Sequence, residues 1–156
     1  MYPAYPVYDT PLLILFFLLG LCLGSFASAI IPREKNNIPW FDLKGDMSRS
    51  ACPSCGSRLG ISELIPVFSW LLQKGKCKNC GAEISAFYPV VEVISGFCAV
   101  AVLYAIGLQS ALILALFLQP FLLAFVYLAL LYAYISKRLA ILCILPSLML
   151  YFLISA

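Results

Sequence analysis

Four cysteines are the residues of this sequence with the most clearly defined chemistry. They form two Cys-x-x-Cys pairs, each followed by glycine, with 21 residues between the pairs, and they stand at Cys52, Cys55, Cys77 and Cys80. Two such pairs at this spacing are typical of a tetrahedral zinc site with four thiolate ligands. The glycine after each second cysteine allows the backbone to turn beneath the metal. Because four thiolates leave zinc no open coordination position, we expect the metal to stabilise a loop rather than to catalyse.

Disulfide bonds and free thiols are the alternatives for these cysteines, and the distribution of positive charge argues against disulfides. Eight of the ten Lys and Arg residues lie between residues 32 and 86, and the other two are Lys137 and Arg138. Segments rich in Lys and Arg remain on the cytoplasmic side of a membrane, where thiols stay reduced. The sequence therefore predicts a zinc-binding cytoplasmic loop and an N-terminus on the outside.

Acidic residues are few, and histidine is absent. Seven Asp and Glu residues occur in all, and none follows Glu92. Without histidine, catalysis by Ser-His-Asp or Cys-His groups and mixed Cys/His zinc sites are excluded. Glu63 is the one acid in the apolar segment 62–72 between the cysteine pairs, which makes it a candidate site residue. Its other interpretation is a solvated residue at the start of a helix, following Ser62.

Glu92 is a second candidate because of its place in an apolar stretch. This stretch begins near Phe87, so Glu92 lies about one and a half helical turns inside it. A carboxylate inside a membrane helix is costly and marks a functional site by default. The alternatives are that Glu92 reaches back to the interface or pairs with a loop Lys or Arg. It is therefore a weaker catalytic candidate.

The elements that position these residues are expected to be membrane helices. The chain has 156 residues, of which 63% are hydrophobic and 11% charged, and its mean hydropathy is +1.01. A soluble domain is about 45–50% apolar and about 25% charged. Crossing a bilayer takes about 20 apolar helical residues. Four stretches approach or exceed this length, at residues 11–31, 87–108, 110–134 and 139–156. The last is short and interrupted by Pro146.

The sequence therefore predicts an all-α polytopic membrane protein with about four transmembrane helices and a cytoplasmic four-cysteine zinc-binding loop between the first two. Residues 1–31 form an external tail and the first helix, residues 32–86 form the loop domain, and residues 87–156 form three further helices. In the first helix, Gly20, Gly24 and Ser28 repeat at a four-residue spacing. Small residues at this spacing let two helices approach closely in lipid, and we expect the contact to lie within the chain rather than in a dimer.

The loop is also expected to contact the membrane surface. Its apolar segment 62–72 should lie against the interface, with Trp70 at the depth of the lipid headgroups. Eight basic and five acidic residues leave segment 32–86 with a net charge of +3, which attraction to anionic lipid headgroups explains. We expect no nucleic-acid partner, because the apolar segment is unsuited to a solvated binding face.

Several of these residues occur in a recognisable order. Together they resemble the N-terminal domain of the prepilin peptidase family (type IV leader peptidases), over about residues 20–96. The matching stretches are Gly24-Ser25-Phe26, Arg33, Arg49-Ser50-Ala51-Cys52-Pro53-Ser54-Cys55, Glu63-Leu64-Ile65-Pro66, Gly75-Lys76-Cys77-Lys78-Asn79-Cys80 and Tyr88-Pro89-Val90-Val91-Glu92. Two departures are Ser28 and Leu64, where the family often has Asn.

The resemblance implies a bacterial inner (cytoplasmic) membrane enzyme of type IV pilus or type II secretion systems. Members of the family cleave the leader of prepilins with two membrane-boundary aspartates and then N-methylate the new terminus with S-adenosylmethionine. Type IV prepilins or pseudopilins are thereby implied as partners, and zinc and S-adenosylmethionine as cofactors. The resemblance also implies that Glu63, Gly75 and Lys76 take part in methyl transfer.

The match fails in the peptidase half. Ser136 stands where the family has its first catalytic aspartate, and the second, in a Gly-x-Gly-Asp motif, would fall beyond Ala156. We therefore expect a chain that is C-terminally truncated relative to the family and has none of the peptidase aspartates. An aspartic peptidase needs two carboxylates that share a proton, so we expect that this chain alone does not cleave prepilin.

Three functions remain open at this point. In the first interpretation, the chain is a zinc-loop module that has lost proteolysis and retains methyl transfer or prepilin binding. Alternatively, it is the non-enzymatic half of a split prepilin peptidase, and a separate chain carries both catalytic aspartates. In the third interpretation it is a decayed, truncated paralogue.

Overall fold

A computed structural model describes residues 8–40 and 50–155 of the chain. Within them the protein is helical, apart from two isolated β-bridges in the segment that carries the cysteines. The elements are α1 (Thr10–Lys35), the 3-10 helix η1 (Ile61–Glu63), α2 (Phe68–Leu72), α3 (Phe87–Ile106), α4 (Ser110–Tyr132) and α5 (Lys137–Ser155). The predicted all-α class is confirmed. We call residues 50–86, which hold η1 and α2, the Cys loop.

Three helices in the described part of the chain, α1, α3 and α4, are long and apolar enough to cross a membrane. Large apolar side chains project from them into open space; Ile113 is 76% exposed and Leu130 is 77% exposed. Such side chains suit lipid, and the chain is a membrane protein. α5 is one helix despite Pro146 inside it, and its role as a fourth span stays a prediction.

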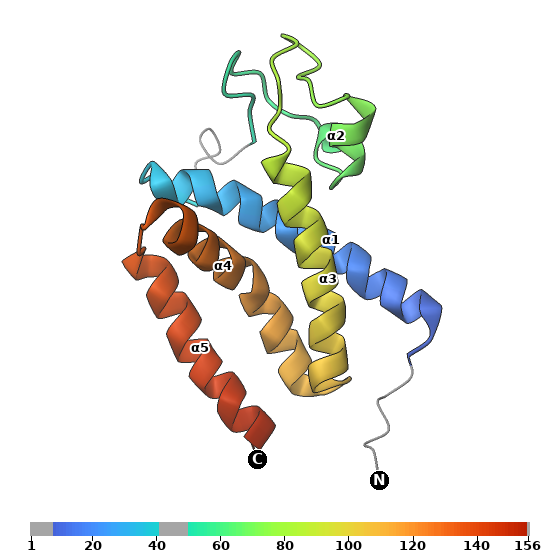
Figure 1. The fold of residues 1–156 in the computed structure, drawn as a ribbon, viewed down its shortest axis with the longest axis vertical. Coiled ribbons are helices and arrows are strands. Elements are labelled where there is room, and N and C mark those ends of the chain that lie inside the picture. Colours follow the sequence, from blue (N-terminus) through green and yellow to red (C-terminus); the bar gives the residue numbers. More distant parts are fainter. Residues whose placement is uncertain (1–7, 41–49, 156) are drawn as a thin grey trace.

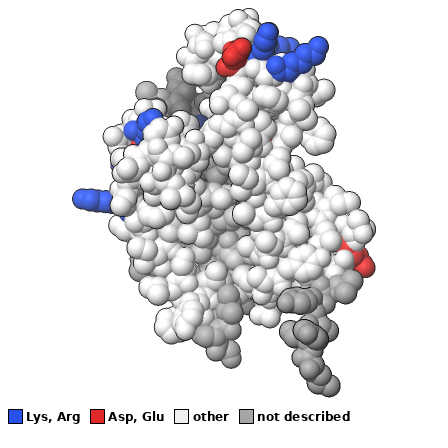
Figure 2. Space-filling view, in the orientation of Figure 1, with Lys and Arg blue, Asp and Glu red and all other residues white. Residues whose placement is uncertain are grey.

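The long helices form a small bundle with the Cys loop at one end (Figure 1). α4 packs between α3 and α5, and α1 crosses obliquely and packs on α3 and α4. The Cys loop lies at the end where α3 begins. Figure 2 shows that the face over the helices is largely uncharged, while basic and acidic side chains gather on the Cys loop and at the margins.

The contact between α1 and α3 depends on the small residues of α1. A Cβ atom on Gly24 would lie 2.6 Å from Glu92 Cα, and one on Gly20 would lie 2.6 Å from the Ser95 carbonyl oxygen. No real Cβ atom comes that close, so both positions need glycine to let the two backbones touch. The predicted close contact is therefore confirmed, and it lies within the chain.

A polar contact joins α3 to α4 inside the bundle. The Gln119 side-chain amide donates to the Ser95 carbonyl oxygen at 2.6 Å and to the Ser95 hydroxyl at 2.9 Å. Both residues are buried. Buried hydrogen bonds of this kind hold membrane helices in register where lipid offers no alternative partner.

The C-terminal end of α1 packs against α4 and α5. Ile30 and Ile31 of α1 lie in a buried cluster with Phe121 and Leu128 of α4 and Leu139 of α5. α1 does not stop there but continues through Pro32 to Lys35. A proline removes one helical hydrogen bond, and this is tolerated so close to the end of a helix. The extra turn carries Glu34 to the connection between α4 and α5.

Candidate metal centre and its link to the membrane helices

The four cysteine sulfurs converge on one point of the Cys loop. All four lie within 4.8 Å of one another, and the Cys52 and Cys80 sulfurs are 3.9 Å apart. Zinc binds thiolates at about 2.3 Å, which places the sulfurs of a tetrahedral site about 3.8 Å apart. Both the donor set and the spacing fit a zinc ion held by Cys52, Cys55, Cys77 and Cys80.

The two cysteine motifs fold in the same way. The Cys52 amide donates to the Ser57 carbonyl at 2.9 Å, and in the second motif the Cys77 amide donates to the Ala82 carbonyl at 2.8 Å. Each motif is closed by one antiparallel β-bridge. The sulfur-bearing turns are therefore two copies of one local structure, facing each other across the metal position.

The predicted role of the two glycines in these turns is confirmed. Gly56 and Gly81, which follow the second cysteine of each motif, have φ values of +70° and +72°. Their amides donate back to the carbonyls of Cys52 and Cys77 at 2.9 and 2.8 Å. An L-residue is strained at this φ, so glycine makes the turn after each cysteine pair possible.

Neighbouring groups shift the pKa values of two of the thiols in opposite directions. The Ser57 hydroxyl and then the Ser57 backbone lower the pKa of Cys55 to about 6. For Cys80 the Ala82 backbone acts toward a lower pKa, but the Cys55 thiol, burial and the Cys77 thiol outweigh it and raise the pKa to about 11. Four thiols this close compete for the same protons, which a divalent cation replaces when it binds.

Trp70 forms the interior of the Cys loop beside the second motif. Its indole N–H donates to the Ile84 carbonyl at 2.9 Å, and a Cβ atom on Gly75 would lie 2.9 Å from its ring. The chain folds back on the indole at Gly75, whose φ is +67°, and Trp70 is half-buried there. The expectation that Trp70 lies at the depth of the lipid headgroups stays a prediction.

The three residues singled out for methyl transfer lie at two places in the Cys loop. Gly75 is buried against Trp70, and Lys76 is exposed immediately before Cys77. Glu63 instead closes η1, where its Oε2 accepts a hydrogen bond from the Gly60 amide at 2.8 Å. Its second oxygen, Oε1, is buried and has no hydrogen-bond partner among residues 8–40 and 50–155.

Glu92 lies where the Cys loop meets the membrane helices. It is only 7% exposed, and its Oε2 accepts a hydrogen bond of 2.6 Å from the Val67 amide of the Cys loop. The Ser25 side chain of α1 also lies close enough to interact with this carboxylate. Glu92 therefore connects three elements instead of reaching outward to the interface.

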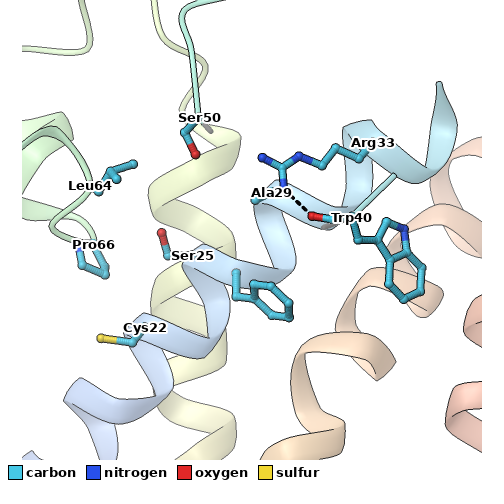
Figure 3. A pocket seen from close by; sticks show the side chains of 9 residues that line it. Cys22, Ser25, Ala29, Arg33, Trp40, Ser50, Leu64 and Pro66 are labelled. Carbon is cyan, nitrogen blue, oxygen red and sulfur yellow. Dashed lines mark hydrogen bonds between the residues drawn. The ribbon is translucent and has the colours of Figure 1, made fainter. Parts of the chain in front are cut away.

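A cavity of about 450 Å³ opens beside this junction. α1 supplies one wall, which includes Cys22, Ser25 and Arg33, and Leu64 and Pro66 of the Cys loop supply another (Figure 3). Trp40 closes one end, where its carbonyl oxygen accepts a hydrogen bond of 2.9 Å from Arg33. The cavity is thus formed jointly by a membrane helix and the Cys loop.

Sequence reasoning missed a buried acid at the far end of α1. Glu34 is 3% exposed; its Oε1 accepts a hydrogen bond from the Ser136 hydroxyl at 2.5 Å and its Oε2 accepts one from the Trp40 indole at 2.6 Å. The sequence does contain one sign of this buried acid, because Glu34 follows the apolar stretch 11–31 by only a few residues. Glu34 falls in the predicted loop 32–86, whereas the structure places it in the last turn of α1.

Comparisons with known proteins point to one family. Residues 18–106 match the family model described as the bacterial peptidase A24 N-terminal domain. The chain is 41% identical over 120 residues to the prepilin leader peptidase/N-methyltransferase of Myxococcus xanthus, which covers 74% of the chain and 34% of that protein. It is 40% identical over 103 residues to the enzyme of the same name from Bacillus subtilis, which covers 63% of the chain and 38% of that protein.

The chain thus spans little more than a third of the length of these curated relatives. No solved structure is significantly similar to it.

Proposed function

Since the chain belongs to the bacterial A24 peptidase family, we propose that it is the zinc-binding and prepilin-binding part of a prepilin-processing system. The observation that supports this most is the junction at Glu92. There the Cys loop is hydrogen-bonded to helices that are long enough to span the membrane, and a cavity lies between them. A membrane-embedded substrate with a polar end would meet both surfaces at this place.

We propose N-methylation with S-adenosylmethionine as the chemistry of this module. Glu63 Oε1 is buried without a hydrogen-bond partner in the described part of the chain. It is therefore suited to accept a hydrogen bond from the terminal amino group of a bound peptide. Bound S-adenosylmethionine would supply the methyl group from its sulfonium and leave as S-adenosylhomocysteine, while the neutral terminal amine gains the methyl group. The Glu63 carboxylate would take up the proton that the methylated nitrogen loses. Gly75 and Lys76 would hold the neighbouring cysteine motif in the required position.

Prepilin cleavage by this chain alone is not part of the proposal. An aspartic peptidase needs two carboxylates around one water molecule. At the position that the resemblance assigns to the first aspartate, Ser136 donates its hydroxyl to Glu34. One carboxylate therefore stands at this place in the described structure, and it is already occupied by two donors.

Assays of methyl transfer, prepilin binding and prepilin cleavage on the purified, membrane-reconstituted chain test the proposal. With labelled S-adenosylmethionine and a pilin peptide that has a free N-terminus, we expect label to enter the peptide, and Glu63→Gln to reduce the rate at least tenfold. Glu83→Gln, which changes an exposed acid of the same loop, is the matched control. The absence of both methyl transfer and prepilin binding would refute the proposal, as would cleavage of full-length prepilin by the chain alone.

We further propose that the membrane is the bacterial inner membrane and that the Cys loop faces the cytoplasm. Basic residues at the end of α1 (Arg33, Lys35) and the start of α5 (Lys137, Arg138) lie at the same end of the bundle as the Cys loop, as the positive-inside rule requires. A membrane-impermeant thiol reagent should label Cys55 in metal-depleted inverted vesicles but not in intact cells. A cysteine introduced by Gln109→Cys, between α3 and α4, should show the opposite pattern.

The membrane surface itself is a proposed contact of the Cys loop. Ile61 is 89% exposed, Leu72 is 80% exposed and Phe68 is 57% exposed, and Lys74 follows them closely in the sequence. Apolar side chains bordered by lysines suit the interface of an anionic bilayer. Replacing Ile61 and Leu72 by Ser should raise the rate at which protease cuts the Cys loop in anionic liposomes.

A second function, as the non-enzymatic half of a split enzyme, is favoured by an apolar groove on the helices. The groove measures about 310 Å³ and is bordered by Val91 and Ile94 of α3 and by Leu123 and Val126 of α4. A transmembrane helix from a chain that carries the two aspartates would fit such a surface. Co-purification of such a chain, lost on Ile94→Asn, would support this function over methyl transfer by the chain alone.

A further inference from the structure

The Cys loop contains a strained turn at the point where it meets the membrane helices. The Phe68 amide donates to the Pro66 carbonyl at 2.6 Å, and Val67 between them has φ +62° and ψ −51°. These values describe a γ-turn of the rare, strained kind. A β-branched residue is particularly disfavoured at positive φ. Such a turn persists only if other contacts hold it in place.

Glu92 supplies the contact that holds this turn. The Val67 amide takes no part in the Phe68–Pro66 hydrogen bond and donates to Glu92 Oε2 at 2.6 Å. A buried amide without an acceptor would be costly, and a buried carboxylate is itself costly without donors. The turn and the acid therefore satisfy each other.

The same carboxylate also fixes α1. Gly24 lets the α1 backbone touch α3 at Glu92, since a Cβ atom there would lie 2.6 Å from Glu92 Cα. The neighbouring Ser25 side chain lies close enough to interact with the Glu92 carboxylate. α1, α3 and the Cys loop are thus joined at one side chain.

This junction borders the cavity between α1 and the Cys loop. Ser25 and Pro66, on either side of the junction, both line the cavity (Figure 3). Pro66 is also the acceptor residue of the strained turn. The position of the loop wall relative to the α1 wall therefore depends on the hydrogen bonds of Glu92.

We infer that Glu92 is a positioning residue, whose carboxylate holds the strained Val67 turn against α1 and so sets the opening of the cavity. That a prepilin segment occupies this cavity is the one part of the inference that rests on the proposed function. Glu92 does not need to touch the substrate in this role. Its loss should widen or disorder the cavity while the four-cysteine centre keeps its metal.

The test is a cross-link across the cavity that needs no substrate. Native Cys22 lies on the α1 wall, and Leu64→Cys would place a second thiol on the loop wall. In the Leu64→Cys chain, the yield of a short bis-maleimide cross-link between these two positions is measured by mass spectrometry of the joined peptides, together with zinc content.

In that background Glu92→Leu should lower the yield at least threefold with zinc content unchanged. Glu92→Gln, whose amide oxygen still accepts the Val67 hydrogen bond, should keep the yield within twofold. Ser25→Ala is a milder variant that removes only the α1 contact, and it should lower the cross-link yield about twofold. If Glu92→Leu does not fold, the yield of Ser25→Ala tests the inference.

Cross-link yields in Glu92→Leu and Ser25→Ala that equal the yield with Glu92 and Ser25 intact would overturn the inference; if only Ser25→Ala folds, its yield alone decides. If the yield falls and methyl transfer to the pilin peptide shows a raised KM with little change in kcat, both the inference and the occupant are supported. If the yield falls and both constants stay the same, the role of Glu92 stands, and the proposed use of the cavity is refuted.

Discussion

The Ser136 hydroxyl donates a hydrogen bond of 2.5 Å to Glu34, joining two residues that are 102 positions apart in the sequence. The same hydroxyl accepts a hydrogen bond from the Leu139 amide at 3.2 Å, so it also serves the first turn of α5. Trp40 donates to the other oxygen of Glu34. The end of α1 is therefore fastened to the connection between α4 and α5 by a buried carboxylate with both oxygens satisfied.

This bond should appear as a coupling energy in a double-mutant cycle. Hydrogen bonds to a charged group contribute about 1.5–3 kcal/mol to stability. We expect the double variant Glu34→Ala/Ser136→Ala to lose less free energy of unfolding than the two single variants lose in sum. The difference, the coupling energy, should be about 1.5–3 kcal/mol. The measurement is unfolding in detergent micelles. Ser147→Ala, elsewhere in α5, is the control, and additive effects would contradict the prediction.

Replacing one cysteine of the cluster should remove the metal and leave the helices folded. We expect Cys52→Ser to lose zinc, because a four-thiolate site with three ligands binds far more weakly. Zinc content and proteolysis of the Cys loop are the measurements, and the helical signal in circular dichroism should change little. Cys22→Ser alters a thiol outside the cluster and should retain zinc. Equal zinc in both variants would rule out the four-cysteine site.

In the metal-free protein the thiols should differ in reactivity with pH. The pKa of Cys55 is lowered to about 6 and that of Cys80 is raised to about 11. The thiolate is the reactive form, so at pH 7 iodoacetamide should modify Cys55 much faster than Cys80. The Cys55 rate should fall as the pH drops through about 6, and the Cys80 rate should rise only toward pH 11.

Mass spectrometry of quenched samples gives both rates. Zinc should protect both residues from modification, which ties the reactivity to the cluster. Equal rates for Cys55 and Cys80 at pH 7 would contradict this prediction.

Gly75→Ala should be more damaging than the same change at Gly81. Both glycines have positive φ, and for an L-residue this conformation costs about 1–2 kcal/mol. A Cβ atom at Gly75 would also lie 2.9 Å from the Trp70 ring, whereas nothing lies within 4 Å of one at Gly81. The difference between the two variants therefore isolates the contact with Trp70.

Zinc affinity and protease resistance of the Cys loop measure this difference. We expect Gly81→Ala to weaken zinc binding modestly and Gly75→Ala to weaken it further. If methyl transfer is lost in Gly75→Ala while zinc binding equals that of Gly81→Ala, Gly75 acts on the substrate rather than on the fold.

Features encoded by short-range spacing could be predicted from the sequence. The two Cys-x-x-Cys-Gly motifs specify their own turns, because each cysteine pair and its glycine are held by hydrogen bonds within a few residues. Apolar stretches specify the membrane helices through their length and composition. The spacing of Gly20 and Gly24 predicts a helix contact, since residues four apart share one face.

Features that join distant segments could not be predicted in this way. The Trp70 indole donates to the Ile84 carbonyl and packs against Gly75, and neither contact follows from its place in the apolar segment 62–72. Glu92 could be identified as a costly acid, but neither of its partners, Ser25 and Val67, follows from its position in the sequence.

Residue types at local spacing were enough to predict the four-cysteine cluster, the helical class and the membrane character of this protein. What the buried acids do depends instead on the tertiary structure. Glu34 and Glu92 are satisfied by donors that the packing of α1 against α3, α4 and the Cys loop brings to them. A carboxylate in an apolar setting must find such donors, and which ones it finds depends on where the helices end and cross.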